Sequence, residues 1–112
     1  VALRLALIAD QLTPLAADGA PVIGGGRALR LSPAWAHIIA NAINRPLHVL
    51  EDDEITARGA ALLARRALGQ ANLHDFPPHI THTIEPIPAI ADVLRDARDR
   101  QTALYERVVR GS

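Results

Sequence analysis

The chain has 112 residues, 49% of them hydrophobic, which is enough apolar material for one folded domain (1–112) and excludes an intrinsically disordered chain. Its twelve basic and twelve acidic side chains cancel, so it lacks the broad positive field with which general nucleic-acid and anionic-membrane binders attract phosphates. Cysteine is absent, which excludes a disulfide framework, a thiolate zinc site and a thiol nucleophile, and we expect a cytoplasmic protein with no nucleic-acid and no membrane partner.

The first predicted element is a helix from residue 1 to about Asp18. Apolar residues recur every three or four positions along one stripe of it: Val1, Leu5, Ile8, Leu12 and Leu15. Pro14 lies inside this pattern and should kink or shorten the last turn. Because the pattern is already under way at Val1, with no capping residue before it, we expect the chain to be a piece of a longer polypeptide.

A short apolar run at residues 20–23 predicts a buried strand. The run ends at Gly24-Gly25-Gly26, where glycine lets the backbone turn sharply. The sequence therefore predicts a strand that leads directly into a glycine turn.

A second helix is predicted to begin at Ser32 and Pro33. A serine side chain can accept a hydrogen bond from a free amide of the first turn, and proline tolerates the first helical position. Asn44 can end the helix in a left-handed conformation, and Pro46 prevents its continuation. Trp35 falls on the apolar stripe of this helix, where a core role outweighs stacking on a base.

Residues 47–50 predict a second strand. The acidic residues 51–54 that follow suit the positive end of a helix, which we expect to run from about Glu54 to Leu68. Gly69 is typical of a residue that ends a helix.

The rest of the chain predicts a connection and a terminal helix. Residues 70–87 contain proline and histidine without a long period, which indicates a connection, and residues 88–110 predict the last helix. Its apolar stripe has steps of four and three residues: Ile90, Leu94, Ala97, Gln101, Leu104 and Val108. The whole order predicts a helix-rich α/β lobe with a short, incomplete sheet. Two short strands cannot cover four helices, so we expect further strands from outside the chain or from a second copy.

The glycine turn is the first candidate site. Glycines after a strand let a ligand approach backbone amides that side chains would otherwise screen. A glycine-rich corner between a strand and a helix is, however, more often only a turn. Its spacing matches neither a dinucleotide fingerprint nor a P-loop, because Gly26 is followed by Arg27 and the chain contains no lysine.

Three segments raise the odds of a functional turn through their order and separation. They are Val22-Ile23-Gly24-Gly25-Gly26, Ser32-Pro33-Ala34-Trp35, and Arg45-Pro46-Leu47 through Glu54-Ile55-Thr56-Ala57-Arg58-Gly59-Ala60-Ala61-Leu62-Leu63-Ala64. This order resembles the C-terminal domain of the FGGY carbohydrate kinases, the family that includes gluconate, xylulose and glycerol kinases. The likeness covers about Val1 to Gly69, and the stretch from Gln101 to Glu106 more loosely resembles the terminal helix of these enzymes.

The resemblance implies a partial actin-like (ribonuclease H-like) ATPase lobe. It makes Gly25 and Gly26 the leading nucleotide-binding residues, with Gly24 close behind and Ser32 as the nearest match for the polar residue on the adenine side. Arg27 is a further candidate, although the stretch after the turn is longer here than in many relatives. The resemblance also marks Gly59 and Ala60 as small residues that let a helix pack closely on the sheet, for which we favour a pure packing role.

The implied reaction is transfer of the γ-phosphoryl group of ATP, with Mg²⁺, to a hydroxyl of a sugar or polyol. Such catalysis is mainly positioning and charge stabilisation, with a carboxylate that accepts the hydroxyl proton. In the family this aspartate and most sugar contacts lie outside the matched segment. We therefore expect ATP and a sugar or polyol as partners of the full enzyme, no catalytic residue in this chain, and no kinase turnover by the chain alone.

A metal site is a weak alternative role for the histidines. His79 and His82, with His74 and Asp75 nearby, are residue types that bind zinc. A step of three residues in an extended segment points the two imidazoles to opposite sides, so we assign no metal ligand.

The alternative function is a non-catalytic interaction module. The stripe of the last helix could form a coiled-coil seam and produce a homodimer. Gln101 and the small Ala97 within that stripe weaken this interpretation.

Overall fold

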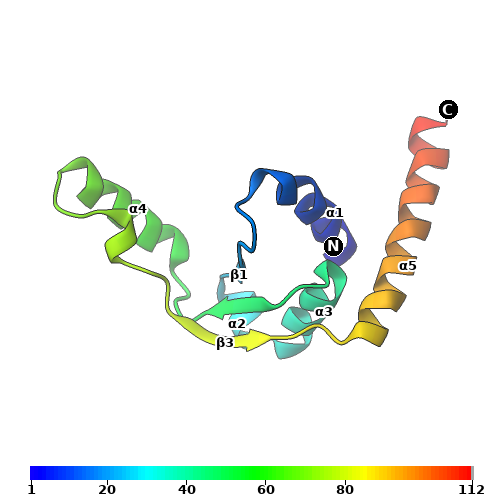
Figure 1. Cartoon of the computed structure of the whole chain (residues 1–112), viewed down its shortest axis with the longest axis horizontal. Coiled ribbons are helices and arrows are strands. Elements are labelled where there is room, and N and C mark those ends of the chain that lie inside the picture. Colours follow the sequence, from blue (N-terminus) through cyan, green and yellow to red (C-terminus); the bar gives the residue numbers. More distant parts are fainter. Residues whose placement is uncertain (112) are drawn as a thin grey trace.

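The computed structural model describes residues 1–111 and shows one short sheet accompanied by helices, two of which project away from it (Figure 1). The strands follow the order β1-β2-β3: Val22–Gly24, Leu47–Leu50 and Ile80–Ile84. The α-helices are α1 (Ala2–Leu12), α2 (Arg27–Leu31), α3 (Pro33–Ile43), α4 (Ile55–Ala67) and α5 (Pro88–Tyr105). Strand β1 runs parallel to β2, and β3 runs antiparallel to it. The predicted helix-rich α/β order is confirmed.

The third strand corrects two expectations. Strand β3 lies inside residues 70–87, which the sequence analysis interpreted as a connection, and a short 3₁₀ turn at Leu73–Asp75 precedes it. The chain thus supplies one of the strands that we expected from elsewhere. Its sequence, Ile80-Thr81-His82-Thr83-Ile84, has β-branched residues on both sides of His82 and suits a strand, but the flanking prolines obscured the period.

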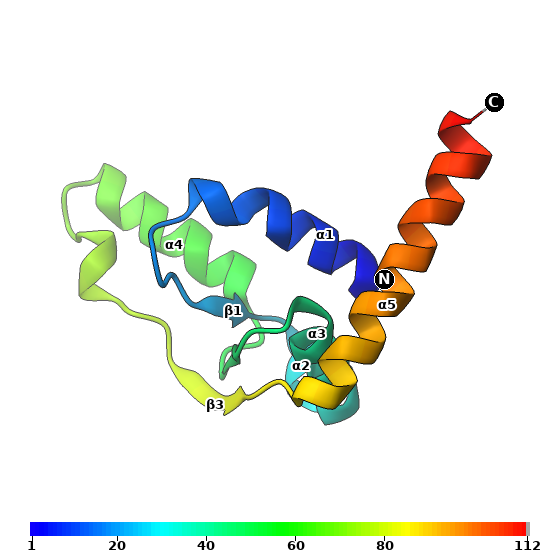
Figure 2. The same cartoon turned by 45° about the vertical axis from the view of Figure 1, so that its right-hand side comes forward.

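The core lies between β2, α3 and α1. The central strand contributes Leu47 and Val49, which are 2% and 0% exposed, and α3 covers them. Helix α1 packs on α3 through alanines, which allow the two helix axes to approach closely (Figure 2). The buried alanines of this contact are Ala2, Ala6, Ala36 and Ala40.

The alanine contact leaves the apolar stripe of α1 largely uncovered. Val1 and Leu15 are 86% and 82% exposed, and Leu5, Ile8 and Leu12 are also exposed. Only the narrow edge with the alanines meets α3. The helix ends at Leu12 and continues as a 3₁₀ turn through Leu15, so the kink near Pro14 is confirmed while the end near Asp18 is wrong.

The predicted helix boundaries of α3 and α4 are confirmed within one residue. The Ser32 hydroxyl accepts a hydrogen bond from the backbone N–H of Trp35 (3.3 Å), and Asn44 ends α3 with a φ of 59°. Gly69 follows α4 with a φ of 72°. These boundaries depend on hydrogen bonds within one turn of the chain, which the sequence displays directly.

Asn41 joins α3 to the start of α5. Its side chain is buried, donates to the carbonyl oxygen of His37 (2.8 Å) and accepts from the backbone N–H of Ile87 (2.6 Å). Asn41→Ala is expected to lower the free energy of unfolding by about 1–3 kcal/mol, because it removes the acceptor for a backbone donor. Urea unfolding measures this change. Gln101→Ala, at an exposed amide, is the control, and equal losses from both variants would contradict the role of Asn41.

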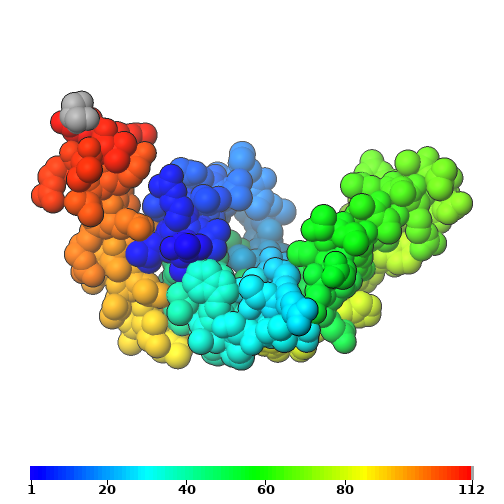
Figure 3. Space-filling model, turned by 180° about the vertical axis from the view of Figure 1, so that it is seen from behind, coloured from blue at the N-terminus to red at the C-terminus, as the bar shows by residue number. Residues whose placement is uncertain are grey.

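Two helices extend away from the core. The radius of gyration is 17.0 Å, whereas a compact domain of this length has about 13 Å (Figures 1 and 3). Within residues 1–111, α4 has no buried side chain and α5 has one, Ala91. The helix axis of α5 continues as a π-helical turn at Glu106–Arg110. No helix in the described part of the chain is long and apolar enough to cross a membrane.

The stripe predicted for the last helix is divided between two environments. Leu94 packs against the core and Ala97 is half-buried, while Ile90, Leu104 and Val108 are exposed. Helix α5 faces α1 and α3 with one side, which carries Leu94. Further along the helix, Arg98 pairs with Asp10 of α1 (2.7 Å), and the Tyr105 ring lies 5.8 Å from the guanidinium of Arg4.

Candidate functional site

The candidate site lies where the parallel strands β1 and β2 end. The glycine turn, residues 24–26, follows β1, and the acidic loop, residues 51–54, follows β2. Because the strands are parallel, both loops emerge at the same edge of the sheet. Ligands of α/β proteins bind beyond the carboxyl ends of parallel strands, so this edge is the natural place for a site.

The three glycines of the turn have different surroundings. A Cβ atom on Gly24 would lie 2.8 Å from Leu29 Cδ1, and one on Gly25 would lie 2.6 Å from Ile55 Cδ1. These two glycines therefore let neighbouring side chains pack onto the backbone. At Gly26, apart from its chain neighbours, no described atom lies within 4 Å of a Cβ position.

Gly26 is where the backbone is open and where glycine is required. Its φ of 106° and ψ of 154° fall in a region that only glycine adopts readily. A ligand can approach this backbone without meeting a side chain. Of the predicted nucleotide-binding glycines, Gly24 is buried beneath its neighbours and Gly25 and Gly26 are partly exposed.

The other two predicted contacts, Arg27 and Ser32, lie at opposite ends of helix α2. The sequence analysis missed this five-residue helix, which begins directly after the turn. Arg27 opens it and is exposed, whereas Ser32 follows its last residue and caps α3. Gly26 and Ser32 are thus about 9 Å apart along a helix axis, given a rise of about 1.5 Å per residue.

An ion pair connects α2, which follows the glycine turn directly, to the acidic loop, and the sequence analysis missed it. Arg30 Nε and Nη2 donate to Asp53 Oδ1 and Oδ2, at 2.5 and 2.7 Å. The hydrogen bonds from Arg30 lower the pKa of Asp53; the positive charges of Arg30 and Arg27 add to this effect, and partial burial opposes it. The same contacts raise the pKa of Arg30. Asp53 was interpreted only as one of four acids near a helix start, and a partner 23 residues away leaves no local signal.

The lowered pKa of Asp53 predicts a pH-dependent stability. A carboxyl with a lower pKa in the folded state stabilises the fold above its unfolded value of 3.8, and the effect is lost as the pH falls through the folded value. Asp53→Asn is therefore expected to lower the melting temperature at pH 7. Below pH 4, the difference in melting temperature between the variant and the wild type should become smaller. Melting curves recorded from pH 7 to pH 3 measure this, and a constant difference across that range would contradict it.

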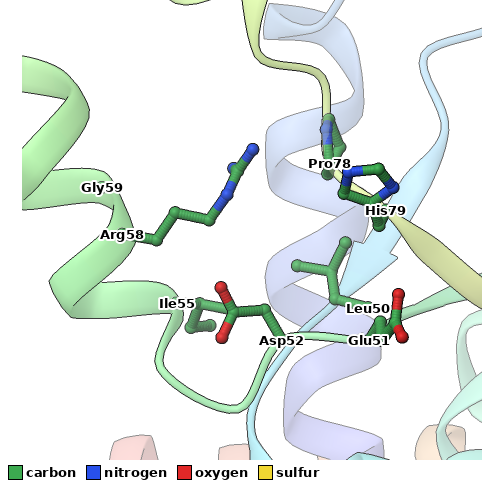
Figure 4. A pocket seen from close by; sticks show the side chains of 8 residues that line it. All are labelled: Leu50, Glu51, Asp52, Ile55, Arg58, Gly59, Pro78 and His79. Atoms are coloured by element: carbon green, nitrogen blue, oxygen red, sulfur yellow. The ribbon is translucent and has the colours of Figure 1, made fainter.

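A cavity of about 450 Å³ lies beside the turn, between the end of β2 and the start of α4 (Figure 4). Leu50 and Ile55 line it, and the same two side chains contact the Cβ position of Gly25. Arg58 reaches across it and donates from Nη2 to the carbonyl oxygens of Phe76 (3.0 Å) and Pro77 (3.2 Å). The remaining lining residues are Glu51, Asp52, Gly59, Pro78 and His79.

The close packing expected at Gly59 and Ala60 is wrong for this structure. Gly59 lines the cavity, and no described atom outside its own helix backbone and chain neighbours lies within 4 Å of its Cβ position. Ala60 is exposed. Helix α4 projects away from the sheet (Figure 1), and this is why no strand packs against the Cβ position of Gly59.

The histidines and acids do not assemble into a metal site within residues 1–111. His48 Nδ1 lies 2.8 Å from the Thr83 hydroxyl on the neighbouring strand. Asp52 accepts a hydrogen bond from the backbone N–H of Glu54 (2.8 Å), and Asp53 pairs with Arg30 as described. The acidic loop therefore uses two of its carboxylates to organise its own backbone and neighbours.

Comparisons with known proteins agree with this architecture. The C-terminal domain of the FGGY family of carbohydrate kinases matches residues 1–68. The crystal structure of xylulose kinase from Rhodospirillum rubrum is similar over 96% of this chain, with a TM-score of 0.73 and 24% identity. This chain corresponds to 22% of that kinase. A search of curated proteins found no match. The likeness confirms the expected fold, a partial, helix-rich α/β lobe with a short sheet.

Proposed function

Because the chain belongs to the FGGY family of carbohydrate kinases, we propose that it is part of an ATP-dependent enzyme that phosphorylates a sugar or polyol hydroxyl, and that it contributes nucleotide binding. The observation that supports this role is the open backbone at Gly26, beyond the carboxyl ends of two parallel strands. A cytoplasmic location belongs to the same proposal.

The proposed nucleotide-binding residues are Gly24, Gly25, Gly26, Arg27 and Ser32. Gly26 would bring its backbone against the nucleotide, since no side chain intervenes. The exposed guanidinium of Arg27 would pair with a phosphate. The Ser32 oxygen already accepts from Trp35, which leaves its hydroxyl hydrogen to donate to the nucleotide. Gly24 would act indirectly, because it lies beneath Leu29 and Leu47.

ATP and Mg²⁺ are the cofactors of the proposed reaction. Mg²⁺ commonly binds through substrate phosphates, waters and only one or two carboxylates. The described residues form no cluster of three ligands, so in this proposal the ion arrives with the nucleotide. The γ-phosphoryl group supplied by ATP is the group that is transferred. The base that accepts the hydroxyl proton and the sugar contacts would come from outside this chain.

The dimerisation alternative has less support. A coiled-coil seam along α5 would need Leu94 and Ala97, but Leu94 packs against the core of its own chain and Ala97 is half-buried. The kinase proposal therefore takes precedence.

Titration of the chain with MgATP tests the proposal. Amide hydrogen exchange is expected to slow at residues 24–32 and to stay unchanged at residues 94–105 of α5. No phosphorylation of a pentose, hexonate or glycerol is expected from the chain alone. Absence of protection at millimolar MgATP would refute the nucleotide-binding role, and phosphorylation by the purified chain would refute the assignment of the catalytic groups to the remainder of the enzyme.

A further inference from the structure

We propose that the Arg30–Asp53 ion pair is a positioning device for the glycine turn, which holds the loop after β1 and the loop after β2 at one fixed separation. The device gives the proposed nucleotide site its geometry, so its relevance to ligand binding rests on the function proposed above. The two residues are positioning residues and do not themselves contact the nucleotide in this proposal.

The geometry of the pair suits a fixed spacer. Both nitrogens on one edge of the Arg30 guanidinium donate to the two oxygens of the Asp53 carboxylate, at 2.5 and 2.7 Å. A bidentate contact of this kind defines orientation as well as distance. The side chains are about one-third exposed, at 35% and 29%, so the pair is accessible yet shielded on one side.

The packing shows why the separation matters for the turn. Leu29, which precedes Arg30 on α2, lies over Gly24, and Ile55, two residues after Asp53, lies against Gly25. Each partner of the ion pair is thus adjacent to a side chain that rests on the turn. A change in the separation of the loops would move these two side chains and, with them, the turn backbone.

Helix α2 depends on such an external contact. Five residues are too few for a helix to be stable on its own in water. Leu29 of α2 packs against the core, and Arg30 pairs with Asp53 in the acidic loop. Nearby charges favour the same pairing, because Glu51 attracts Arg30 and Arg27 attracts Asp53.

A double-mutant cycle tests the device with the 112-residue chain. The variants are Asp53→Asn, Arg30→Gln and both together, and Asp52→Asn is the matched control. Asp52 lies next to Asp53, and as asparagine it keeps the oxygen that accepts from Glu54 N–H. A charge reversal is unsuitable as a rescue, because Glu51 and Arg27 would then repel the exchanged charges.

Two measurements are made on each variant: amide hydrogen exchange of residues 24–32 without nucleotide, and affinity for MgATP. Each single variant is expected to accelerate exchange of these amides about fivefold, in line with the loss of one partly exposed ion pair. The double variant is expected to show no further acceleration, since both changes remove the same contact. Affinity is expected to fall by a similar factor, and Asp52→Asn, which keeps the contact with Glu54 N–H, should leave the exchange of these amides unchanged.

Each outcome has a distinct meaning. Unchanged exchange in the single variants, or additive acceleration in the double variant, overturns the positioning device. Accelerated exchange with unchanged MgATP affinity overturns its connection to the ligand. Absence of MgATP binding by the unmutated chain refutes the proposed function, and the exchange data still decide whether the pair orders the turn.

Discussion

Leu47→Ala is expected to lower the free energy of unfolding by about 2–5 kcal/mol, because it leaves a cavity in the centre of the core. Leu47 is 2% exposed on the middle strand, pairs with Ile84 of β3 and belongs to the cluster that α3 covers. Its Cδ1 also lies 3.1 Å from the Cβ position of Gly24. The same substitution should therefore loosen the glycine turn and accelerate amide exchange at Gly24.

Urea unfolding followed by the fluorescence of Trp35, the single tryptophan, measures this loss. Trp35 packs against the core cluster, so its emission should report core opening. Leu68→Ala is the matched control, since Leu68 is 72% exposed and its truncation should cost under about 0.5 kcal/mol. Similar losses from both substitutions would show that Leu47 does not occupy the core.

Gly26→Ala is expected to destabilise the chain by about 1–3 kcal/mol and to weaken MgATP binding at least ~10-fold. The free-energy cost follows from a φ of 106° with a ψ of 154°, which a residue with a Cβ atom adopts only under strain. The affinity loss follows if the backbone relaxes to a negative φ, because the turn would then present different groups to the ligand. Calorimetric titration and melting curves measure the two effects.

Gly59→Ala gives the matched control for Gly26→Ala. Gly59 lies within α4, and among the described atoms none outside its own helix backbone and chain neighbours is within 4 Å of its Cβ position. Alanine in a helix is favoured over glycine by about 0.5–1 kcal/mol, so this substitution should stabilise the chain and leave MgATP affinity unchanged. Effects of the same sign at both glycines would contradict the backbone conformation of the turn.

The two glycine substitutions also separate the possible roles of the turn. If Gly26→Ala reduces stability but MgATP affinity follows the fraction of folded protein, the turn is only structural. If affinity falls while the protein remains folded, the open backbone itself contacts the nucleotide. The second result is the one that the proposed function requires.

Local features of this protein could be predicted from the sequence alone. Helix α3 begins directly after Ser32 and ends directly before Asn44, as expected, and the strand that ends at Gly24 was also predicted. The order of these motifs along the chain was sufficient to indicate the family. Each of these features depends on residues within a few positions of each other, so the chemistry that determines it is visible in a short stretch of sequence.

Only the tertiary structure decided which surfaces meet. It selected the alanine edge of α1 over the leucine stripe, converted residues 80–84 into a strand paired with β2, and joined Arg30 to Asp53. These outcomes depend on contacts between segments far apart in the chain, where helix packing distance and strand pairing outweigh local hydrophobic period. The same distinction holds for the candidate site. The glycines in the sequence allow the backbone to turn, whereas the tertiary contacts of Leu29 and Ile55 cover Gly24 and Gly25 and leave Gly26 open.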